Sequence, residues 1–299
     1  MFKMVPTHLL TRLLILLLML LEFCCAPGHQ NQGRDTTGAD QQSVQPVANP
    51  VSPANSSRNR PAGVKVIRVV VALCDNVHQG IVPVPARLGN GDDPESNLYW
   101  GAGFGVKTFL ARSPDWRVLA QIDNPKPGIL LRRCILRHRN RDVYIIADAY
   151  QGIEIKRAIS EFLDLASGAG SEHVAVQAGG GDLVLDGSAD LIAYVGHDGL
   201  MDFSLPQYPR SRSEGNRDAM VLCCASKSYF SNAIRAGGAR PLLLTTGLMA
   251  PEAYVLEAAI TGWMSGETGE QICARAASAY NKYQKCGYRA ARGLFTSGN

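Results

Sequence analysis

The sequence predicts a three-layer α/β domain built around a mainly parallel sheet. Short β-branched and apolar runs of strand length alternate along the chain with segments of helical periodicity, which is typical of strand–helix–strand units. Several of these runs are apolar at every position. Such runs indicate strands that are buried on both faces, as in a parallel sheet covered by helices on both sides.

The first predicted strand, residues 64–74, opens the folded domain. The long loop at 75–97, rich in Gly, Pro and Asp, either lines a site or is an ordinary surface loop. The next elements are a helix at 98–112, strands at 116–123, 129–136 and 143–147, an amphipathic helix at 152–166, and strands before His197 and Cys224. A helix at 229–235, a strand at 240–246 and helices at 251–263 and 267–292 complete the order, with Pro251 in a first helical turn.

Residues 1–28 have the features of a secretory signal peptide. Lys3 and Arg12 supply positive charge, and residues 13–21 form an apolar core too short to span a bilayer. Cys24 follows a lipobox-like Leu-Glu-Phe and is a candidate for lipidation, which would tether the domain to a membrane. Simple cleavage at the small-x-small site of residues 26–28 and an uncleaved signal anchor are the alternatives. We therefore expect a bacterial cell-envelope protein, periplasmic or an outer-membrane lipoprotein, or a secreted one.

Residues 29–62 are rich in Gln, Asn, Ser, Pro and Gly and contain few large apolar side chains. Such a segment cannot bury enough surface to offset its ordering entropy, so it is expected to be a disordered linker before a domain at 63–299. The formal net charge of +4 over 299 residues is too small to predict a nucleic-acid footprint. No paired Cys and His spacing of a zinc site is present, and no cofactor is expected.

Six cysteines remain beyond the signal region: Cys74, Cys134, Cys223, Cys224, Cys273 and Cys286. Cys273 and Cys286 fall in one predicted helix, about 20 Å apart at about 1.5 Å per residue, which is too far for a disulfide. A strained bridge between Cys223 and Cys224 would block any nucleophile there.

Two predicted strands each end in a side chain suited to hydrolysis. Leu-Ile-Ala-Tyr-Val leads through Gly196 to His197, and Ala-Met-Val-Leu leads through Cys223 to Cys224. The carboxyl ends of parallel strands meet at one edge of a sheet, where ligands bind in α/β folds. An imidazole there can take the thiol proton and return it to a leaving amine. The sequence therefore predicts a His/Cys dyad.

This order of motifs resembles the caspase-like cysteine peptidases, the caspase, gingipain and CHAT group. The residues that carry the resemblance are Tyr194-Val-Gly-His-Asp-Gly199, the strand ending at Cys224, and Ala236-Gly-Gly-Ala239 before a further strand. The resemblance implies a six-stranded caspase-like sheet flanked by helices, a His197/Cys224 dyad, a peptide or protein substrate, and backbone amides near Gly199 and Cys224 that hold an oxyanion. In three respects the chain departs from the family pattern: Asp198 precedes Gly199, Cys223 replaces a small residue, and only 27 positions separate His197 from Cys224.

Other polar groups offer competing interpretations. Asp75 and Asn76 end the first strand and are candidates for substrate contacts or turn formation, and His78 is a rival base. Residues 90–95 supply several carboxylates, but a solvated turn is favoured over calcium. The basic cluster at 132–141 is interpreted as the exposed face and turn of a hairpin, and the Gly-rich run at 101–105 lies too far from the first strand for a dinucleotide turn.

The sequence thus predicts an exported cysteine hydrolase, a caspase-like peptidase. The alternative is a non-catalytic envelope binding or scaffolding module in which the loop at 75–97, with Tyr99 and Trp100, holds a ligand or a partner protein. Residues 204–217 form either a processing loop, with Arg210, Arg212 and Arg217 as cleavage sites, or a plain connector.

Overall fold

The computed structural model describes residues 61, 63–169, 174–178, 181–185, 189–211 and 216–298. These residues belong to one compact unit, 55–299. The predicted signal peptide and all of the predicted linker except Pro61 lie outside the described residues. Within the described ranges, no helix has both the length and the apolar character needed to cross a membrane.

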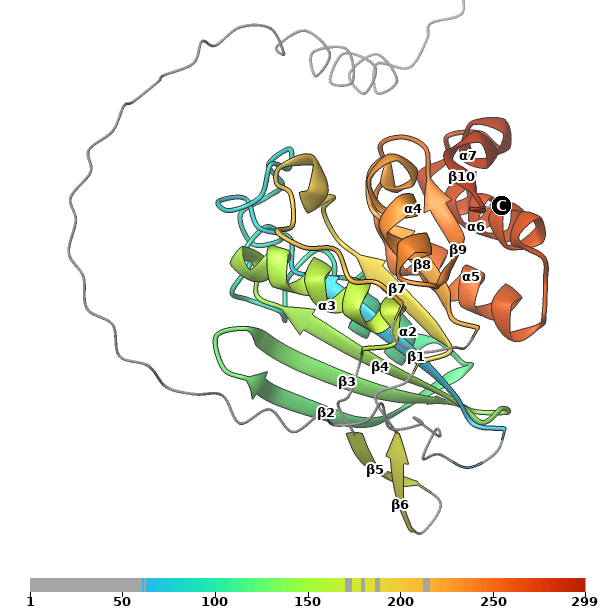
Figure 1. The fold of residues 1–299 in the computed structure, drawn as a ribbon. Coiled ribbons are helices and arrows are strands. Elements are labelled where there is room, and N and C mark those ends of the chain that lie inside the picture. The colour runs from blue at the N-terminus through green and yellow to red at the C-terminus, as the bar shows by residue number, and fades with distance from the viewer. Residues whose placement is uncertain are drawn as a thin grey trace, which may run out of the picture. The chain divides into compact units, whose positions relative to one another are not determined.

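A large mixed sheet forms the centre of the fold and confirms the α/β class (Figure 1). Its order is β10-β9-β8-β7-β1-β4-β3-β2, in which β9, β8, β7, β1 and β4 run parallel and β10, β3 and β2 run antiparallel to their neighbours. The bounds are β1 (Lys65–Ala72), β2 (Trp116–Lys126), β3 (Leu130–His138), β4 (Val143–Tyr150), β7 (Leu191–Val195), β8 (Asp218–Leu222), β9 (Arg240–Thr245) and β10 (Phe295–Thr296). The described sheet thus has eight strands instead of the expected six.

Helices cover both faces of the parallel strands. On one face, α3 (Ile155–Ser167) and α4 (Ser226–Ala236) pack on Tyr194 and Val221. On the other face, α2 (Val106–Arg112), α5 (Ala253–Met264) and α6 (Gly269–Gln284) pack on Val195 and Leu222. Successive side chains of a strand point to opposite faces, so each strand contributes to both cores. The remaining elements are η1 (Gly152–Glu154), η2 (Gly199–Met201), α7 (Tyr288–Leu294) and a separate hairpin of β5 (Val174–Ala178) and β6 (Gly181–Leu185).

Two predicted helices are shorter than expected. Residues 98–105 form turns, because Gly101 and Gly105 lie against neighbouring backbone, where a Cβ would come within about 2.4 Å of carbonyl atoms. The long C-terminal helix is broken into α6 and α7, since Lys285 and Gly287 both adopt positive φ angles, of 56° and 90°. Pro251 lies before α5 and not in its first turn. The β5–β6 hairpin and β10 were not predicted, because Gly-rich and two-residue strands carry little periodic signal.

Candidate active site

His197 and Cys224 follow neighbouring parallel strands, as expected. Val195 of β7 is the register partner of Leu222 of β8, so each reactive residue lies two positions beyond a paired position. This register brings the two backbones to the same height at the carboxyl edge of the sheet, on strands about 4.8 Å apart. Strand register therefore places the backbones of His197 and Cys224 at the same edge of the sheet.

The two adjacent thiols lie on opposite sides of the sheet. Cys223 is fully buried in the core under α3 and α4, with Tyr194 and Phe230. Cys224 is half-buried and contacts Met249 of the opposite core, whose backbone N–H donates to Sγ at 3.5 Å. All six described cysteines are free thiols, so no bridge joins this pair. Of the two, Cys224 is the thiol that a substrate can reach.

A strained turn follows Cys224. Ala225 has φ 48° and ψ 28°, a left-handed conformation that is uncommon for a residue with a Cβ, and it caps the start of α4. Its N–H donates to the carbonyl of Gly247 at 2.9 Å. Ser226 secures the turn by donating to the Val221 carbonyl at 3.0 Å and accepting from the Thr245 N–H at 2.8 Å. Strain of this kind persists where surrounding structure enforces it, and it clusters at functional sites.

The electrostatics of Cys224 favour the neutral thiol. Burial raises its pKa above the ordinary value of 9.0, and the negative charge of Asp198 raises it further, against the lowering effect of the Met249 N–H. Only a small fraction is therefore thiolate at neutral pH. Chemistry at this sulfur needs a base that removes the proton when the substrate arrives.

His197 is held by a carboxylate that the sequence analysis did not identify. Its Nε2 lies 2.6 Å from Oδ2 of Asp202, and no described residue forms a hydrogen bond with Nδ1. Tyr194 Oη donates to the His197 carbonyl at 2.8 Å and fixes the backbone of the turn. The available sequence signal was an acidic residue five positions after the histidine, in the turn that follows the same strand.

Backbone amides near both residues are uncommitted. In the described structure, the N–H groups of Asp198 and Cys224 have no hydrogen-bond acceptor. The N–H of Gly199 instead donates to the His197 carbonyl at 3.1 Å, so Gly199 is not available as the expected oxyanion donor. The backbone N–H of Asp198 therefore replaces that of Gly199 as the candidate donor to an oxyanion.

The Asp198 side chain points into the protein and not toward solvent. It is fully buried, and Oδ1 accepts the Leu200 N–H at 3.1 Å. Burial raises its pKa to about 7, although hydrogen bonds from Leu200 and the Cys223 thiol lower it. The Asp198 side chain therefore influences the site through its charge, and it does not face a substrate directly.

Asp75 and Asn76 fold the loop that follows β1. Asp75 Oδ1 accepts the N–H groups of Val77 and His78, and Oδ2 lies 2.8 Å from His78 Nδ1. Asn76 exchanges two hydrogen bonds with the backbone of Val84, at 2.8 and 3.0 Å. These polar atoms are used within the loop, and His78, the rival base, is paired with Asp75. Their geometry is that of turn-forming residues.

The loop at 75–97 is tied to the sheet by amide side chains. Asn97 bonds both backbone groups of Cys74, accepting its N–H at 3.0 Å and donating to its carbonyl at 2.8 Å. Gln79 donates to the carbonyls of Leu73 and Gly152. Carboxylates at 92–95 accept bonds from their own turn and from Lys107. No group of three or more His, Cys, Asp or Glu in the described ranges is arranged to hold a metal ion.

The basic cluster at 132–141 lies on β3 and in the turn between β3 and β4, but Arg133 is not on an exposed face. Arg133 is buried and forms two hydrogen bonds with Asp148 of β4, at 2.6 and 2.9 Å, and buried Arg68 of β1 reaches the same carboxylate at 2.9 Å. The interpretation of the whole cluster as a solvated face was wrong for Arg133 and for His138, which are both buried. The directly opposite register partner of Arg133 on β4 is Asp148, which explains the burial of Arg133.

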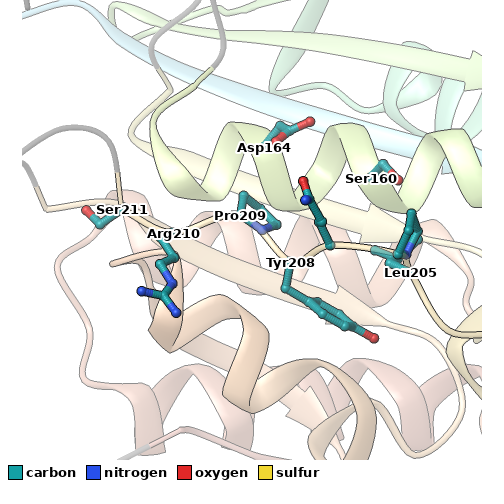
Figure 2. A pocket seen from close by; sticks show the side chains of 9 residues that line it. Ser160, Asp164, Leu205, Tyr208, Pro209, Arg210 and Ser211 are labelled. Atoms are coloured by element: carbon teal, nitrogen blue, oxygen red, sulfur yellow. The ribbon is translucent and has the colours of Figure 1, made fainter.

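A pocket of about 410 Å³ lies between α3 and the segment at 205–211. Figure 2 shows Ser160 and Asp164 on α3 and Tyr208 and Arg210 on the segment beside it. Neither His197 nor Cys224 lines it. Of the suggested cleavage sites on this connection, Arg217 is buried and donates to the Ala166 carbonyl at 3.0 Å, and Arg212 lies outside the described residues. Arg217 is therefore not open to a protease in the folded domain.

Comparison with known proteins finds no matching family model, no matching curated protein and no matching solved structure. The site is therefore interpreted from its own geometry.

Proposed function

We propose that this protein is a cysteine hydrolase, a caspase-like peptidase in which Cys224 is the nucleophile and His197 the base. The observation that carries the proposal is the strand register: Val195 pairs with Leu222, and both reactive residues follow two positions later on parallel strands. Burial of Cys223 leaves Cys224 as the accessible thiol. Substrate would lie along the carboxyl edge of the sheet, where ligands of α/β folds bind.

In the proposed reaction, Cys224 Sγ attacks the scissile carbonyl carbon while its proton passes to Nδ1 of His197. A C–S bond forms, and the carbonyl oxygen becomes an oxyanion. When the intermediate collapses, the C–N bond breaks and the proton on Nδ1 goes to the leaving amine. Water then attacks the thioester, gives a proton to His197 and releases the acid, and the thiol regains its proton.

The oxyanion is assigned to the uncommitted N–H groups of Asp198 and Cys224. Backbone donors of this kind are preorganised, and one of them is typically worth about 10²–10³-fold in rate. The turn at Ala225 supports this assignment, because its bond to Gly247 holds the backbone just after Cys224 in a fixed direction. No cofactor takes part in this scheme.

The proposal is tested with electrophilic peptide probes, such as a mixture of peptidyl acyloxymethyl ketones, read out by intact-mass and peptide mass spectrometry. We expect one adduct on Cys224, strongly slowed in His197→Gln and unaffected by Cys286→Ala, since Cys286 is an exposed thiol elsewhere. Labelling of Cys286 alone would contradict the proposal. It would favour the non-catalytic envelope binding module, for which the raised pKa of Cys224 is the supporting observation.

We further propose that the protein is exported to the bacterial envelope, on the strength of the signal-like residues 1–28, with Cys24 as a candidate lipid anchor. Its partner there would be a peptide or protein substrate and not nucleic acid, given the net charge of +4. Globomycin, which blocks lipoprotein signal processing, distinguishes lipidation at Cys24 from simple cleavage, because only the lipidated form accumulates as precursor.

A further inference from the structure

The turn that follows β7 brings a carboxylate onto the imidazole of His197. Asp202 Oδ2 lies 2.6 Å from Nε2, and the His197 side chain is about 10% exposed while that of Asp202 is 39% exposed. An ionised carboxylate only accepts hydrogen bonds, so Nε2 must carry the proton. In the neutral ring, Nδ1 then keeps the lone pair, and Nδ1 is the nitrogen without a partner in the described structure.

A second contact positions the carboxylate itself. The N–H of Gly80, in the loop after β1, donates to Asp202 Oδ2 at 3.1 Å. A Cβ built at Gly80 would lie only 2.6 Å from Asp202 Oδ1 and 3.0 Å from its Cγ, so a side chain at this position would displace the Asp202 carboxylate. The backbone at Gly80 has no left-handed φ, so replacing Gly80 by Ala alters the contact with Asp202 and does not strain the backbone.

We propose that Asp202 is a positioning residue that fixes the Nε2–H tautomer of His197, and that Gly80 holds Asp202 in place. The proposal rests on the function proposed above, because the tautomer matters only if Nδ1 accepts the proton of Cys224. In the wrong tautomer, Nδ1 carries a hydrogen and cannot act as a base. The loop after β1 thereby contributes to the site through Gly80, although Asp75 and Asn76 are used within the loop itself.

The direct test is the tautomer of His197, observed by ¹⁵N NMR of histidine-labelled protein at pH 9, with His197→Gln identifying its signals. In the unaltered protein we expect a protonated Nε2 and an unprotonated Nδ1. Asp202→Ala should give a mixture of tautomers, and Asp202→Glu, which keeps the carboxylate, should partly restore the single form. Gly80→Ala should shift the tautomer without changing either residue of the pair.

Gly103→Ala is the matched control, since a Cβ there meets no atom within 4 Å and Gly103 lies in a loop of the same domain. Thermal denaturation checks that each variant is folded. An unchanged tautomer in both Asp202→Ala and Gly80→Ala would overturn the proposal.

Probe labelling of Cys224 gives the second readout. We expect Asp202→Ala to slow labelling by at least about tenfold, but by less than His197→Gln, because a general base as a whole contributes about 10²–10⁴-fold. Equal labelling rates in Asp202→Ala and the unaltered protein would also count against the proposal. If the tautomer responds as expected but no variant, including the unaltered protein, is labelled at Cys224, then the positioning contact stands and the hydrolase proposal fails.

Discussion

Replacing Cys223 separates the roles of the two adjacent thiols. Cys223 is fully buried between Tyr194 and the helices on its face of the sheet, whereas Cys224 faces the opposite core and is partly open. Cys223→Ala removes one buried sulfur atom, a group about the size of a methylene. Its transfer is worth about 0.8 kcal/mol, and a cavity term of about 24 cal/mol per Å³ adds a similar amount. The expected loss of stability is therefore about 1–2 kcal/mol.

For a domain of this size, 1 kcal/mol corresponds to about 2–4 °C in Tm, so Cys223→Ala should melt about 2–8 °C lower. Circular dichroism measures the melting, and mass spectrometry after reaction with the electrophilic probe measures labelling. We expect Cys223→Ala to remain labelled at Cys224 and Cys224→Ala to lose labelling with a smaller change in Tm. The reverse pattern, labelling lost in Cys223→Ala and kept in Cys224→Ala, would refute the assignment of the two thiols to opposite faces.

Three further predictions follow from the charges near the site and in the core. Because burial and Asp198 raise the pKa of Cys224, its alkylation by iodoacetamide in His197→Gln should still be rising above pH 9, and a plateau below pH 8 would contradict this. Asp198 has a pKa of about 7 in the folded chain, against 3.8 ordinarily, so the folded state holds a proton that the unfolded state has lost and stability falls as the pH rises between these values. Asp198→Asn should therefore be more stable than the unaltered protein at pH 8 but not at pH 4. Urea denaturation at the two pH values measures this difference. Asp148→Asn leaves Arg68 and Arg133 facing a neutral group in the core and should lower the free energy of unfolding by about 3–5 kcal/mol. The control Asp123→Asn removes only an exposed partner of Arg132 and should lower it by less than about 1 kcal/mol. Similar losses of stability for the two variants in urea denaturation would show that the buried cluster is not coupled.

The strands at the centre of the site could be predicted from the sequence because their signal is local. The runs before His197 and Cys224 are apolar at nearly every position, and burial on both faces of a parallel sheet requires that pattern. Strand adjacency followed from the order of elements. The α/β class and the edge at which both residues lie were therefore accessible without a structure.

Features that depend on turn geometry could not be predicted in this way. The contact between Asp202 and His197 depends on how residues 196–202, which follow β7, fold, and its link to Gly80 joins positions 122 residues apart. Arg133 stands beside Arg132 in a basic cluster and so looks like a solvated position, but its partner Asp148 is supplied by another strand. The break between α6 and α7 depends on a left-handed Lys285, which periodicity does not register.

The separation of His197 and Cys224 in an experimental structure of the unliganded protein tests the central claim most directly. The account predicts that Nδ1 of His197 lies within about 4 Å of Cys224 Sγ, either directly or after one rotamer change, or is joined to it by a single water. An imidazole directed away from the thiol and beyond the reach of one bridging water would contradict it.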